Sequence, residues 1–388
     1  MRVLVVSNLY PPHALGGYEM SCADVMRRFR QRGHDVHVLT TTTQLDVAVG
    51  GDDVVDVERT LEWYWSDHRL VQLGRVASWR LDRRNRRRLR RAIDDFRPDV
   101  VSFWAMGGMS LSLLEVAARA DVPAVWVVCD EWPVYGPRID RHAAFHGQRV
   151  PAPGEAAICW VSEFIRNQVL HATGWESRHG TVTGSGIDET DFPVQPARSR
   201  AWGWELLCVG RVEPRKGFAT AVEALALLPG EARLRIAGPD DGSHGDELRR
   251  LADQLGVGDR LTIGAIPRSR LAEVYAGADA VLFTSAWNEP FGLVPLEAMA
   301  CATPVVAVPT GGAAEFLMDE SNCLAVAPGD ASALAAATQR LATDERLRAA
   351  LVAGGRATAS RLTMQRLTDV LEQWHEAAAA RFREGEPR

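Results

Sequence analysis

The sequence almost lacks lysine. Of its 44 basic residues only Lys216 is a lysine, and every other one is an arginine. This lysine stands in the segment Gly210–Gly217, directly after the apolar run 205–209. An ammonium on a flexible stem can enter a tight cluster of oxyanions without the fork geometry that a guanidinium requires. We therefore interpret Lys216 as part of a phosphate site.

Three further absences narrow the class of protein. The net charge is −6, so the excess of cations that a dedicated nucleic-acid binder needs is missing. No two of the six cysteines form a C-x-x-C pair, which indicates reduced thiols and neither a disulfide framework nor a zinc site. No apolar run approaches the length of about eighteen residues that a spanning helix needs, and the opening run 1–7 is too short for a signal peptide. We expect a cytoplasmic protein.

The order of apolar runs predicts the fold class. Short Val-rich runs alternate with helical patterns in both halves, which is typical of parallel sheets covered on both faces. The predicted strands are 2–7, 36–40, 99–104, 123–129 and 156–161 in the first half, and 205–209, 233–237, 260–263, 280–284 and 304–308 in the second. The pattern predicts an α/β protein with two Rossmann-like, doubly wound domains that face each other across a cleft.

The length of the chain also favours two domains, because 388 residues exceed what one core usually serves. The segment 192–200 holds two prolines and few apolar residues, and we place the linker there. The predicted domains are therefore 1–192 and 201–362, followed by a C-terminal helix and tail over 363–388. Nothing in the sequence indicates on which domain the last helix packs.

A second segment of the C-terminal half, Asn288–Ala300, combines two carboxylates with a loop and a helix start. Pro295 is expected as the first residue of the helix, whose free amides, aided by Gly292, would bind an anion. Glu297, one turn into the helix, can accept hydrogen bonds from a diol, and Glu289 would face the reacting end of the ligand. Together with Lys216 these residues predict a site for a nucleoside diphosphate that carries a polyol.

These motifs resemble those of the retaining glycosyltransferases of family 4, which have the GT-B architecture. Glu289 and Glu297 reproduce the E-x7-E signature of that family, and Gly210-Arg211 with Lys216-Gly217 reproduces its G-R-x4-K-G loop. The resemblance extends in order over nearly the whole chain, with further matches at Gly16-Gly17, Gly33-His34, Gly186-Ile187-Asp188 and Gly311-Gly312 with Glu315.

The resemblance implies an enzyme of carbohydrate biosynthesis that moves a sugar from a UDP- or GDP-linked donor to an acceptor hydroxyl, with retention and without a metal ion or other cofactor. It implies that Arg211 and Lys216 hold the donor diphosphate, that Glu297 holds the ribose, and that backbone near Ile266 meets the base. It further assigns the donor sugar and phosphate to Glu289 with the amides of Phe291, Gly292 and Leu293, and a diphosphate contact to the Gly16-Gly17 loop. The N-terminal domain is expected to bind the acceptor.

One departure from the family pattern concerns the segment after the run 124–128. Many relatives have His-Asp there, whereas this chain has Cys129-Asp130. We interpret Cys129 as a small core residue and not as a reactive thiol. Asp130 is our candidate for a contact with the acceptor or the sugar. Two other functions stay open at this point, a sugar-nucleotide epimerase and a nucleotide-sugar-binding protein that has lost catalysis.

The segment Arg80–Arg91 is strongly basic, with eight arginines and one aspartate. Leu89, Ile93 and Phe96 fit the core-facing stripe of an ordinary surface helix, which favours a solvated face. The same arginines would also attract anionic lipid headgroups or an anionic acceptor, and Trp79 lies close enough in sequence to anchor such a contact at a membrane. The sequence thus leaves peripheral membrane contact open, and it predicts no oligomeric state.

Overall fold

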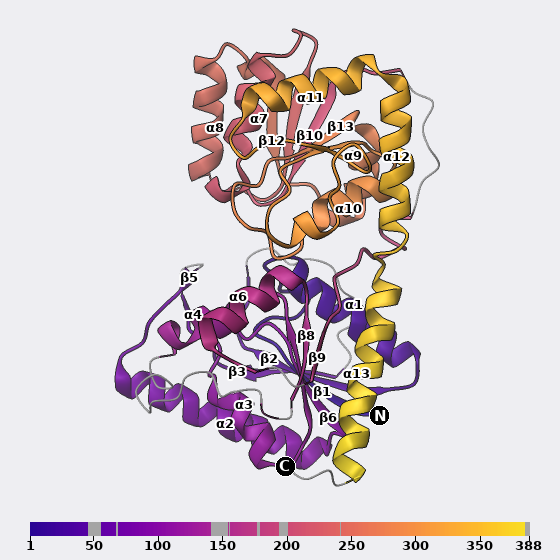
Figure 1. Cartoon of the computed structure of the whole chain (residues 1–388). Coiled ribbons are helices and arrows are strands. Elements are labelled where there is room, and N and C mark those ends of the chain that lie inside the picture. Colours follow the sequence, from indigo (N-terminus) through magenta and orange to yellow (C-terminus); the bar gives the residue numbers. More distant parts are fainter. Residues whose placement is uncertain are drawn as a thin grey trace. The chain divides into compact units, whose positions relative to one another are not determined.

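The computed structural model describes residues 1–45, 56–66, 69–140, 154, 156–176, 179–193, 201–240 and 242–384. The chain divides into two compact units, one formed by Met1–Ser185 with Met364–Arg388 and the other by Gly186–Thr363. Figure 1 shows the helices and strands of each unit. None of the described helices is both long and apolar enough to cross a membrane.

The division of the chain differs from the predicted domains in two respects. The first unit ends at Ser185 and not at residue 192, and the last helix is a part of this unit instead of a separate segment. Apolar side chains of that helix, such as Leu367 and Leu371, lie in the core of the first unit, which is the physical reason for its place. Most of the predicted linker 192–200 lies outside the described residues.

The first unit is built on a parallel sheet in which seven strands are described, in the order β3-β2-β1-β6-β7-β8-β9. The strands are β1 (Arg2–Val6), β2 (Asp35–Thr41), β3 (Val57–Leu61), β6 (Val100–Phe103), β7 (Ala124–Val128), β8 (Ala157–Trp160) and β9 (Gly180–Val182). The short strands β4 (Trp65–Ser66) and β5 (Arg69–Leu70) form an antiparallel pair beside it. Each pair of neighbours in the main sheet is parallel, as the Val-rich runs predict.

Helices cover both faces of this sheet (Figure 1). They are α1 (Gly17–Gln31), α2 (Arg75–Phe96), α3 (Ser112–Arg119), α4 (Trp132–Ile139), α6 (Glu163–Thr173) and α13 (Met364–Glu384). Residues of α1 and α13 share one core cluster with alternate residues of the strands, for example Val3 and Val5. Helices α2 and α3 pack on each other at the other face. Successive side chains of β1 point to opposite faces of the sheet, so this strand contributes apolar side chains to the packing on both faces.

Helix α13 carries a buried histidine that joins it to the sheet. The Nδ1 atom of His375 lies 2.6 Å from the carbonyl oxygen of Leu371, and its Nε2 atom lies 2.8 Å from the hydroxyl of Ser102. A carbonyl oxygen only accepts, so Nδ1 carries the proton and Nε2 accepts from Ser102. The same Ser102 oxygen accepts from the indole of Trp104 at 2.9 Å. Burial of the ring lowers the pKa of His375 to about 4.

We expect this histidine to make the first unit less stable as the pH falls. The unfolded chain binds a proton at His375 below its usual pKa, whereas the folded chain does not until about pH 4, so stability is lost through this window. Near pH 5 the loss amounts to about 2 kcal/mol. In urea unfolding, the stability difference between wild type and His375→Gln should therefore shrink by about this amount between neutral pH and pH 5. A difference that does not change with pH would contradict a neutral His375.

The second unit contains another parallel sheet, in which six strands are described in the order β12-β11-β10-β13-β14-β15. The strands are β10 (Glu205–Val209), β11 (Arg233–Ala237), β12 (Leu261–Gly264), β13 (Ala280–Phe283), β14 (Val305–Ala307) and β15 (Leu324–Ala325). The helices are α7 (Phe218–Ala226), α8 (Ser243–Gln254), α9 (Arg268–Gly277), α10 (Leu293–Ala300), α11 (Ala331–Thr343) and α12 (Glu345–Ala359). Both units are therefore Rossmann-like, and the predicted α/β fold class is confirmed.

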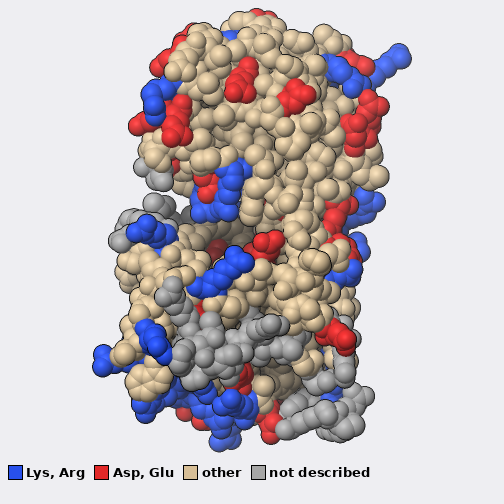
Figure 2. All heavy atoms as spheres, turned by 60° about the vertical axis from the view of Figure 1, so that its left-hand side comes forward, with Lys and Arg blue, Asp and Glu red and all other residues tan. Residues whose placement is uncertain are grey.

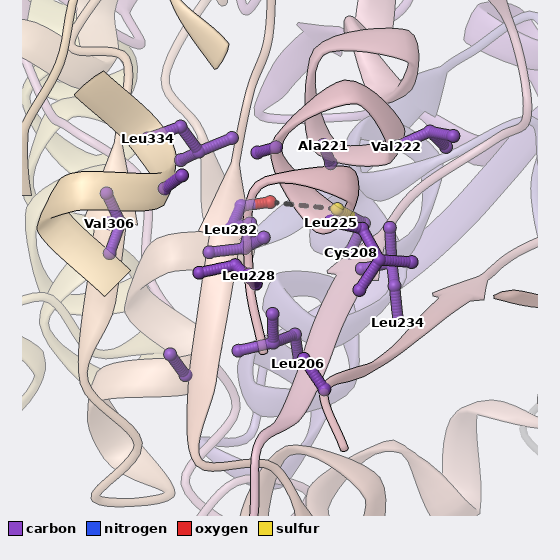
Figure 3. Packing of buried hydrophobic residues seen from close by; sticks show 14 of the residues in the cluster. Leu206, Cys208, Ala221, Val222, Leu225, Leu228, Leu234, Leu282, Val306 and Leu334 are labelled. Carbon is purple, nitrogen blue, oxygen red and sulfur yellow. Dashed lines mark hydrogen bonds between the residues drawn. The ribbon is translucent and has the colours of Figure 1, made fainter. Parts of the chain in front are cut away.

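One core of the second unit lies between its sheet and helices α7, α8 and α11. Figure 3 shows Leu206 and Cys208 of β10 beside Leu282 of β13, with Leu225 of α7 and Leu334 of α11 packed over them. The Cys208 thiol donates to the carbonyl oxygen of Leu282 at 3.2 Å, and burial raises the pKa of this thiol. Cys208 is therefore a structural, protonated residue. This core fixes the ends of β10 and β13, from which the site described next extends.

Candidate functional site

The central strands of the second unit, β10 and β13, lie side by side although they are not consecutive in the chain. From β10 the chain crosses through α7 to β11 on one side, and from β13 it crosses through α10 to β14 on the other side. Between these two strands the direction of winding reverses. Ligands of open α/β sheets bind beyond the carboxyl ends of the strands at such a point. The loops that follow β10 and β13 carry Lys216 and Glu289.

Lys216 and Glu289 form a direct ion pair at this edge of the sheet. The ammonium Nζ lies 2.6 Å from Oε1 of Glu289, and the hydroxyl of Ser285 donates to the same oxygen at 2.8 Å. The side chain of Glu289 is only 9 % exposed, whereas that of Lys216 is 20 % exposed. One cation is thus held at the surface end of a buried carboxylate, where it can meet a ligand from solvent.

Glycines allow the lysine loop to approach the neighbouring strands closely. A Cβ atom on Gly217 would lie 2.1 Å from the carbonyl oxygen of Thr284, and the φ of Gly217 is +67°. A Cβ atom on Gly238, which follows β11, would lie 1.9 Å from the carbonyl oxygen of Gly210. The stem of Lys216 runs past Gly210, where an added Cβ would be in van der Waals contact with it. The glycine at position 217 of the G-R-x4-K-G loop is therefore required because a larger residue would collide with the backbone of Thr284.

We expect Gly217→Ala to destabilise the second unit by about 1–3 kcal/mol, because the new methyl group meets backbone and the left-handed φ is strained for alanine. Gly230→Ala is the matched control, since nothing lies within 4 Å of a Cβ atom there. Urea unfolding followed by circular dichroism measures both effects. Equal stability of the two variants would contradict the close packing of Gly217 on Thr284.

The helix after the second loop begins earlier than predicted. Helix α10 starts at Leu293 with Gly292 as its N-cap, so the prediction that Pro295 is the first helical residue is wrong. Gly292 has a φ of +92°, a left-handed conformation that favours glycine and turns the chain directly into the helix. Pro295 is tolerated at the third position because the first amides of a helix have no partner within it.

The backbone before Gly292 is fixed by a hydrogen bond, whereas the amides at and beside Gly292 are available to a ligand. The amide of Gly312 donates to the carbonyl oxygen of Glu289 at 2.7 Å, and a Cβ atom on Gly311 would lie 2.3 Å from that oxygen. Within the described part of the chain, the amides of Phe291, Gly292 and Leu293 have no recorded hydrogen bond. These N–H groups and the positive end of the α10 dipole can therefore stabilise an anion.

Glu297 lies on α10 in a different cluster from Glu289. It is 6 % exposed, and one of its oxygens accepts from the hydroxyl of Tyr275 on α9 at 2.6 Å. Its other oxygen lies 3.8 Å from the guanidinium of Arg268, which also pairs with Asp191 at 2.9 Å. Burial raises the pKa of Glu297, and the Arg268 charge opposes this rise. A carboxylate oriented in this way has lone pairs left with which to accept a hydrogen bond from a ligand hydroxyl.

The remaining predicted residues of the second unit lie near the surface. Arg211 lies in the loop after β10, and its guanidinium, on a side chain that is 45 % exposed, lies 3.8 Å from Glu213. Arg215 pairs with Glu213 at 2.6 Å and lies over the Trp287 ring. Ile266 is half-buried in the loop between β12 and α9. The structure therefore brings Lys216 into contact with Glu289, whereas Arg211 pairs with Glu213 at the surface and does not contact either residue of that pair.

The Gly16-Gly17 pair of the first unit stands at the start of α1, beyond the carboxyl end of β1. Both glycines are exposed, and nothing lies within 4 Å of a Cβ atom built on Gly16. The amide of Gly16 donates to the buried carboxyl of Glu19 at 3.1 Å, which is the glutamate half of a capping box, since glycine has no side chain for the other half. Burial raises the pKa of Glu19 to about 7. The loop is therefore fixed from inside by Glu19 and open toward solvent.

Cys129 and Asp130 follow β7 in the same unit. The amide of Cys129 donates to the hydroxyl of Tyr18 at 3.3 Å, and burial raises the pKa of its thiol well above the usual value. Asp130 accepts from the amide of Trp132 at 3.1 Å and from the hydroxyl of Tyr135 at 2.9 Å. Burial raises the pKa of Asp130 to about 6. The thiol is thus protonated and unreactive, and both oxygens of Asp130 help to fix the start of α4.

Among the described residues, one group offers the atoms of a metal site, namely His34, Glu372 and Glu376 of the first unit. Its geometry is that of an ion-pair network between α13 and the turn before β2. The Nε2 atom of His34 lies 2.5 Å from Glu372, and the guanidinium of Arg32 pairs with Glu372 and Asp369. Arg32 already supplies the positive charge, so these residues are better explained as a link that holds α13 in place.

Sequence reasoning missed several residues that support the predicted ones. These residues bind the predicted ones but lie far from them in sequence or outside the motifs. They are Ser285, which contacts Glu289, Tyr275 and Arg268, which contact Glu297, and Glu19, which accepts from the amide of Gly16. The only local signal was the position of Glu19, three residues after Gly16, which is the spacing of a capping box.

Comparison with known proteins gives the family of both units. Residues 15–191 match the family model described as Glycosyltransferase Family 4, and residues 197–358 match that described as Glycosyl transferases group 1. A glycogen synthase of Mycobacterium tuberculosis is 30 % identical over 408 aligned residues, which cover 98 % of this chain and 93 % of that protein. A D-inositol 3-phosphate glycosyltransferase of Xylanimonas cellulosilytica is 41 % identical over 178 residues, which cover 45 % of this chain and 40 % of that protein.

Solved structures share the whole fold at lower sequence identity. Sucrose-phosphate synthase from Thermosynechococcus elongatus superposes with a TM-score of 0.74 at 22 % identity, over 98 % of this chain and 99 % of that one. HepE of Anabaena, in complex with UDP and glucose, has a TM-score of 0.74 at 19 % identity, over 97 % of this chain and 100 % of its own. These similarities show that the two units have the arrangement of elements found in GT-B glycosyltransferases.

Proposed function

The chain belongs to glycosyltransferase family 4 and is a glycosyltransferase, and we propose that it transfers a hexose from a nucleoside diphosphate to an acceptor hydroxyl. In this proposal the anomeric configuration is retained and no metal ion takes part. The second unit binds the donor, and the first unit binds the acceptor. Lys216, Arg211 and Glu289 act on the reacting end of the donor.

The observation that carries the proposal is the ion pair of Lys216 with Glu289 beside the open amides of α10. A diphosphate would become the second anionic partner of the ammonium, and the helix start would stabilise its negative charge. Arg211, which is exposed on the same loop, would close on the other side. Two cations and a helix N-terminus supply the neutralisation of the leaving group that a metal ion gives in other enzymes.

The transfer itself then needs no nucleophile from the protein. The bond between the anomeric carbon and the diphosphate oxygen breaks, and the acceptor oxygen bonds to that carbon from the same face. The proton of the acceptor hydroxyl passes to the departing diphosphate oxygen. Glu289, whose carboxylate is oriented by Ser285 and Lys216, would hold a sugar hydroxyl and the anomeric centre in place.

For the nucleoside, we propose that Glu297 accepts hydrogen bonds from the ribose and that backbone near Ile266 contacts the base. The relative in M. tuberculosis is named a glycogen synthase, and HepE was solved with UDP and glucose, which makes UDP-glucose the first donor to test. The Gly16-Gly17 loop of the first unit would contact the diphosphate. Cys129 and Asp130 would lie by the sugar or the acceptor.

A thermal-shift screen of sugar nucleotides tests the donor. A ligand at about 100 times its Kd stabilises the folded protein by about 2.7 kcal/mol and should raise Tm by roughly 5 °C. One sugar nucleotide should give this shift with wild type and a smaller one with Arg211→Ala. If no sugar nucleotide shifts Tm, the proposed donor site is wrong.

Product analysis then separates transfer from the two other functions. The bound donor is incubated with and without candidate acceptors in the presence of a chelator, and the anomeric configuration of the product is read by NMR. The proposal expects an α-linked product from an α-linked donor at a rate that the chelator does not change. An isomerised donor without acceptor would indicate an epimerase, and tight binding without turnover on any acceptor would indicate a silent binding protein.

A further inference from the structure

The outer side of α2 in the first unit forms an arginine-lined groove with α3. The groove has a volume of about 480 Å³, and five arginines line it (Arg83, Arg86, Arg87, Arg90 and Arg119), together with Trp79, Val116 and the carboxylate Asp82. Figure 2 shows basic side chains gathered at the lower end of this unit, where α2 lies in Figure 1. None of the residues that line the groove is among the predicted site residues.

The positive charge of the groove is only partly compensated. Arg90 pairs with Asp94 at 3.2 Å, Arg119 pairs with Glu115 at 2.8 Å, and Arg86 lies 4.0 Å from the buried Asp82. Arg83 and Arg87 have no recorded ion pair within the described part of the chain. By contrast, Arg84 and Arg88 on the next face of α2 share Glu62. Two of the arginines that line the groove, Arg83 and Arg87, are therefore available to an anionic partner.

Apolar side chains continue the same helix face toward its N-terminus. Val76 is 62 % exposed and Trp79 is 45 % exposed, although both are large apolar residues. The guanidinium of Arg83 lies 5.4 Å from the centre of the Trp79 ring. The first turn of α2 contains no acidic residue, so nothing there repels an anion from the positive end of the helix dipole. We call Val76, Trp79, Arg83, Arg87 and Arg90 the docking face.

We propose that the docking face binds the first unit to the anionic phosphate headgroups of a lipid bilayer, with Trp79 and Val76 entering the interface. Exposed tryptophan beside arginine on one helix face is the composition of an interfacial helix. From Val76 to Arg90 the face extends about 21 Å at the rise of an α-helix, which is longer than one soluble phosphate requires. A duplex nucleic acid is a poorer partner, because it offers no apolar layer to cover the exposed Val76 and Trp79, whereas a bilayer interface does.

The docking face begins at the edge of the sheet where the first unit carries its predicted ligand residues. The carboxyl end of α2 leads into the amino end of β6, so its amino end, with Val76 and Trp79, points to the carboxyl edge of the parallel strands. The side chain of Asn85 accepts from the amide of Glu62 and donates to its carbonyl oxygen, which fixes α2 beside the residue that follows β3. Headgroups on the docking face would thus lie toward the edge that carries Gly16 and Cys129.

Co-sedimentation with vesicles tests this proposal, and it requires neither donor nor acceptor. Wild type should bind phosphatidylcholine vesicles that contain phosphatidylglycerol, and it should not bind pure phosphatidylcholine. Each basic residue near an anionic surface adds roughly five-fold to binding, so Arg83→Gln with Arg87→Gln should weaken partitioning about 25-fold. The control is Arg250→Gln with Arg346→Gln, which removes two exposed arginines from α8 and α12. Its partitioning should change less than about two-fold, since these residues lie outside the docking face.

A second measurement asks whether Trp79 enters the bilayer. Brominated lipids should quench part of the tryptophan fluorescence of wild type, and Trp79→Phe should lose that part while the other eleven of the 12 tryptophans report as before. Binding of Arg83→Gln with Arg87→Gln equal to wild type would overturn the proposal. It would also fall if inorganic tripolyphosphate bound the groove with the same arginine dependence while vesicles did not, because the groove would then serve a soluble polyanion.

Discussion

Replacing Lys216 by alanine is expected to lower kcat/KM by about 30- to 1,000-fold, a loss of about 2 to 4 kcal/mol of transition-state stabilisation. Among the described residues the ammonium is the one cation paired with Glu289, and no other lysine exists in the sequence to replace it. Negative charge grows on the diphosphate as its bond to the sugar breaks, so the ammonium stabilises the transition state more than the bound donor. We therefore expect a lower kcat in addition to a higher KM for the donor.

The matched control is Arg215→Ala, one residue away. Its guanidinium pairs with Glu213 and lies over Trp287, and it does not contact Glu289. Loss of such an exposed pair should change kcat/KM by less than about five-fold. Thermal melting of both variants checks that they are folded, because Lys216→Ala leaves the buried Glu289 with Ser285 as its recorded partner. Unchanged turnover of Lys216→Ala would remove this lysine from the mechanism.

Most of the fold could be predicted from the sequence because the central strands are buried on both faces. Each of the ten predicted strands is a strand of the structure, for instance 205–209 and 233–237, which match β10 and β11. The edge strands β3, β9 and β15 were missed. Strand β3, Val57–Leu61, is largely half-buried and contains Glu58 and Arg59, so it lacks an apolar run such as that of β7.

The candidate site was predictable only where its residues lie within motifs. Lys216 and Glu289 were each identified from local sequence, and their contact follows because β10 and β13 are neighbours in the sheet. The surroundings of Glu297 were not predictable, since Tyr275 and Arg268 come from α9 and carry no pattern of their own. The start of α10 was misplaced because a proline is common at the first helical position, whereas here Gly292 sets the start.

Glu297→Gln is expected to weaken nucleotide binding by roughly 10- to 150-fold, because a hydrogen bond to a charged group contributes about 1.5 to 3 kcal/mol. Glutamine keeps the shape of the side chain and can still accept from Tyr275, so the fold should be retained. Alanine is less informative, because it would leave the buried Tyr275 hydroxyl without its partner. Calorimetric titration with UDP and with the preferred sugar nucleotide measures the change.

The dependence on pH adds a second readout for the same carboxylate. Burial raises the pKa of Glu297, so wild type should lose affinity for the nucleotide at a higher pH than an ordinary glutamate would, as protonation removes the charged acceptor. Glu297→Gln should lack this dependence. Tyr275→Phe is the matched control, since it removes the partner hydroxyl and leaves the carboxylate in place. If Glu297→Gln and Tyr275→Phe lose stability alike and neither changes Kd, then Glu297 only joins α9 to α10 and does not hold the ribose.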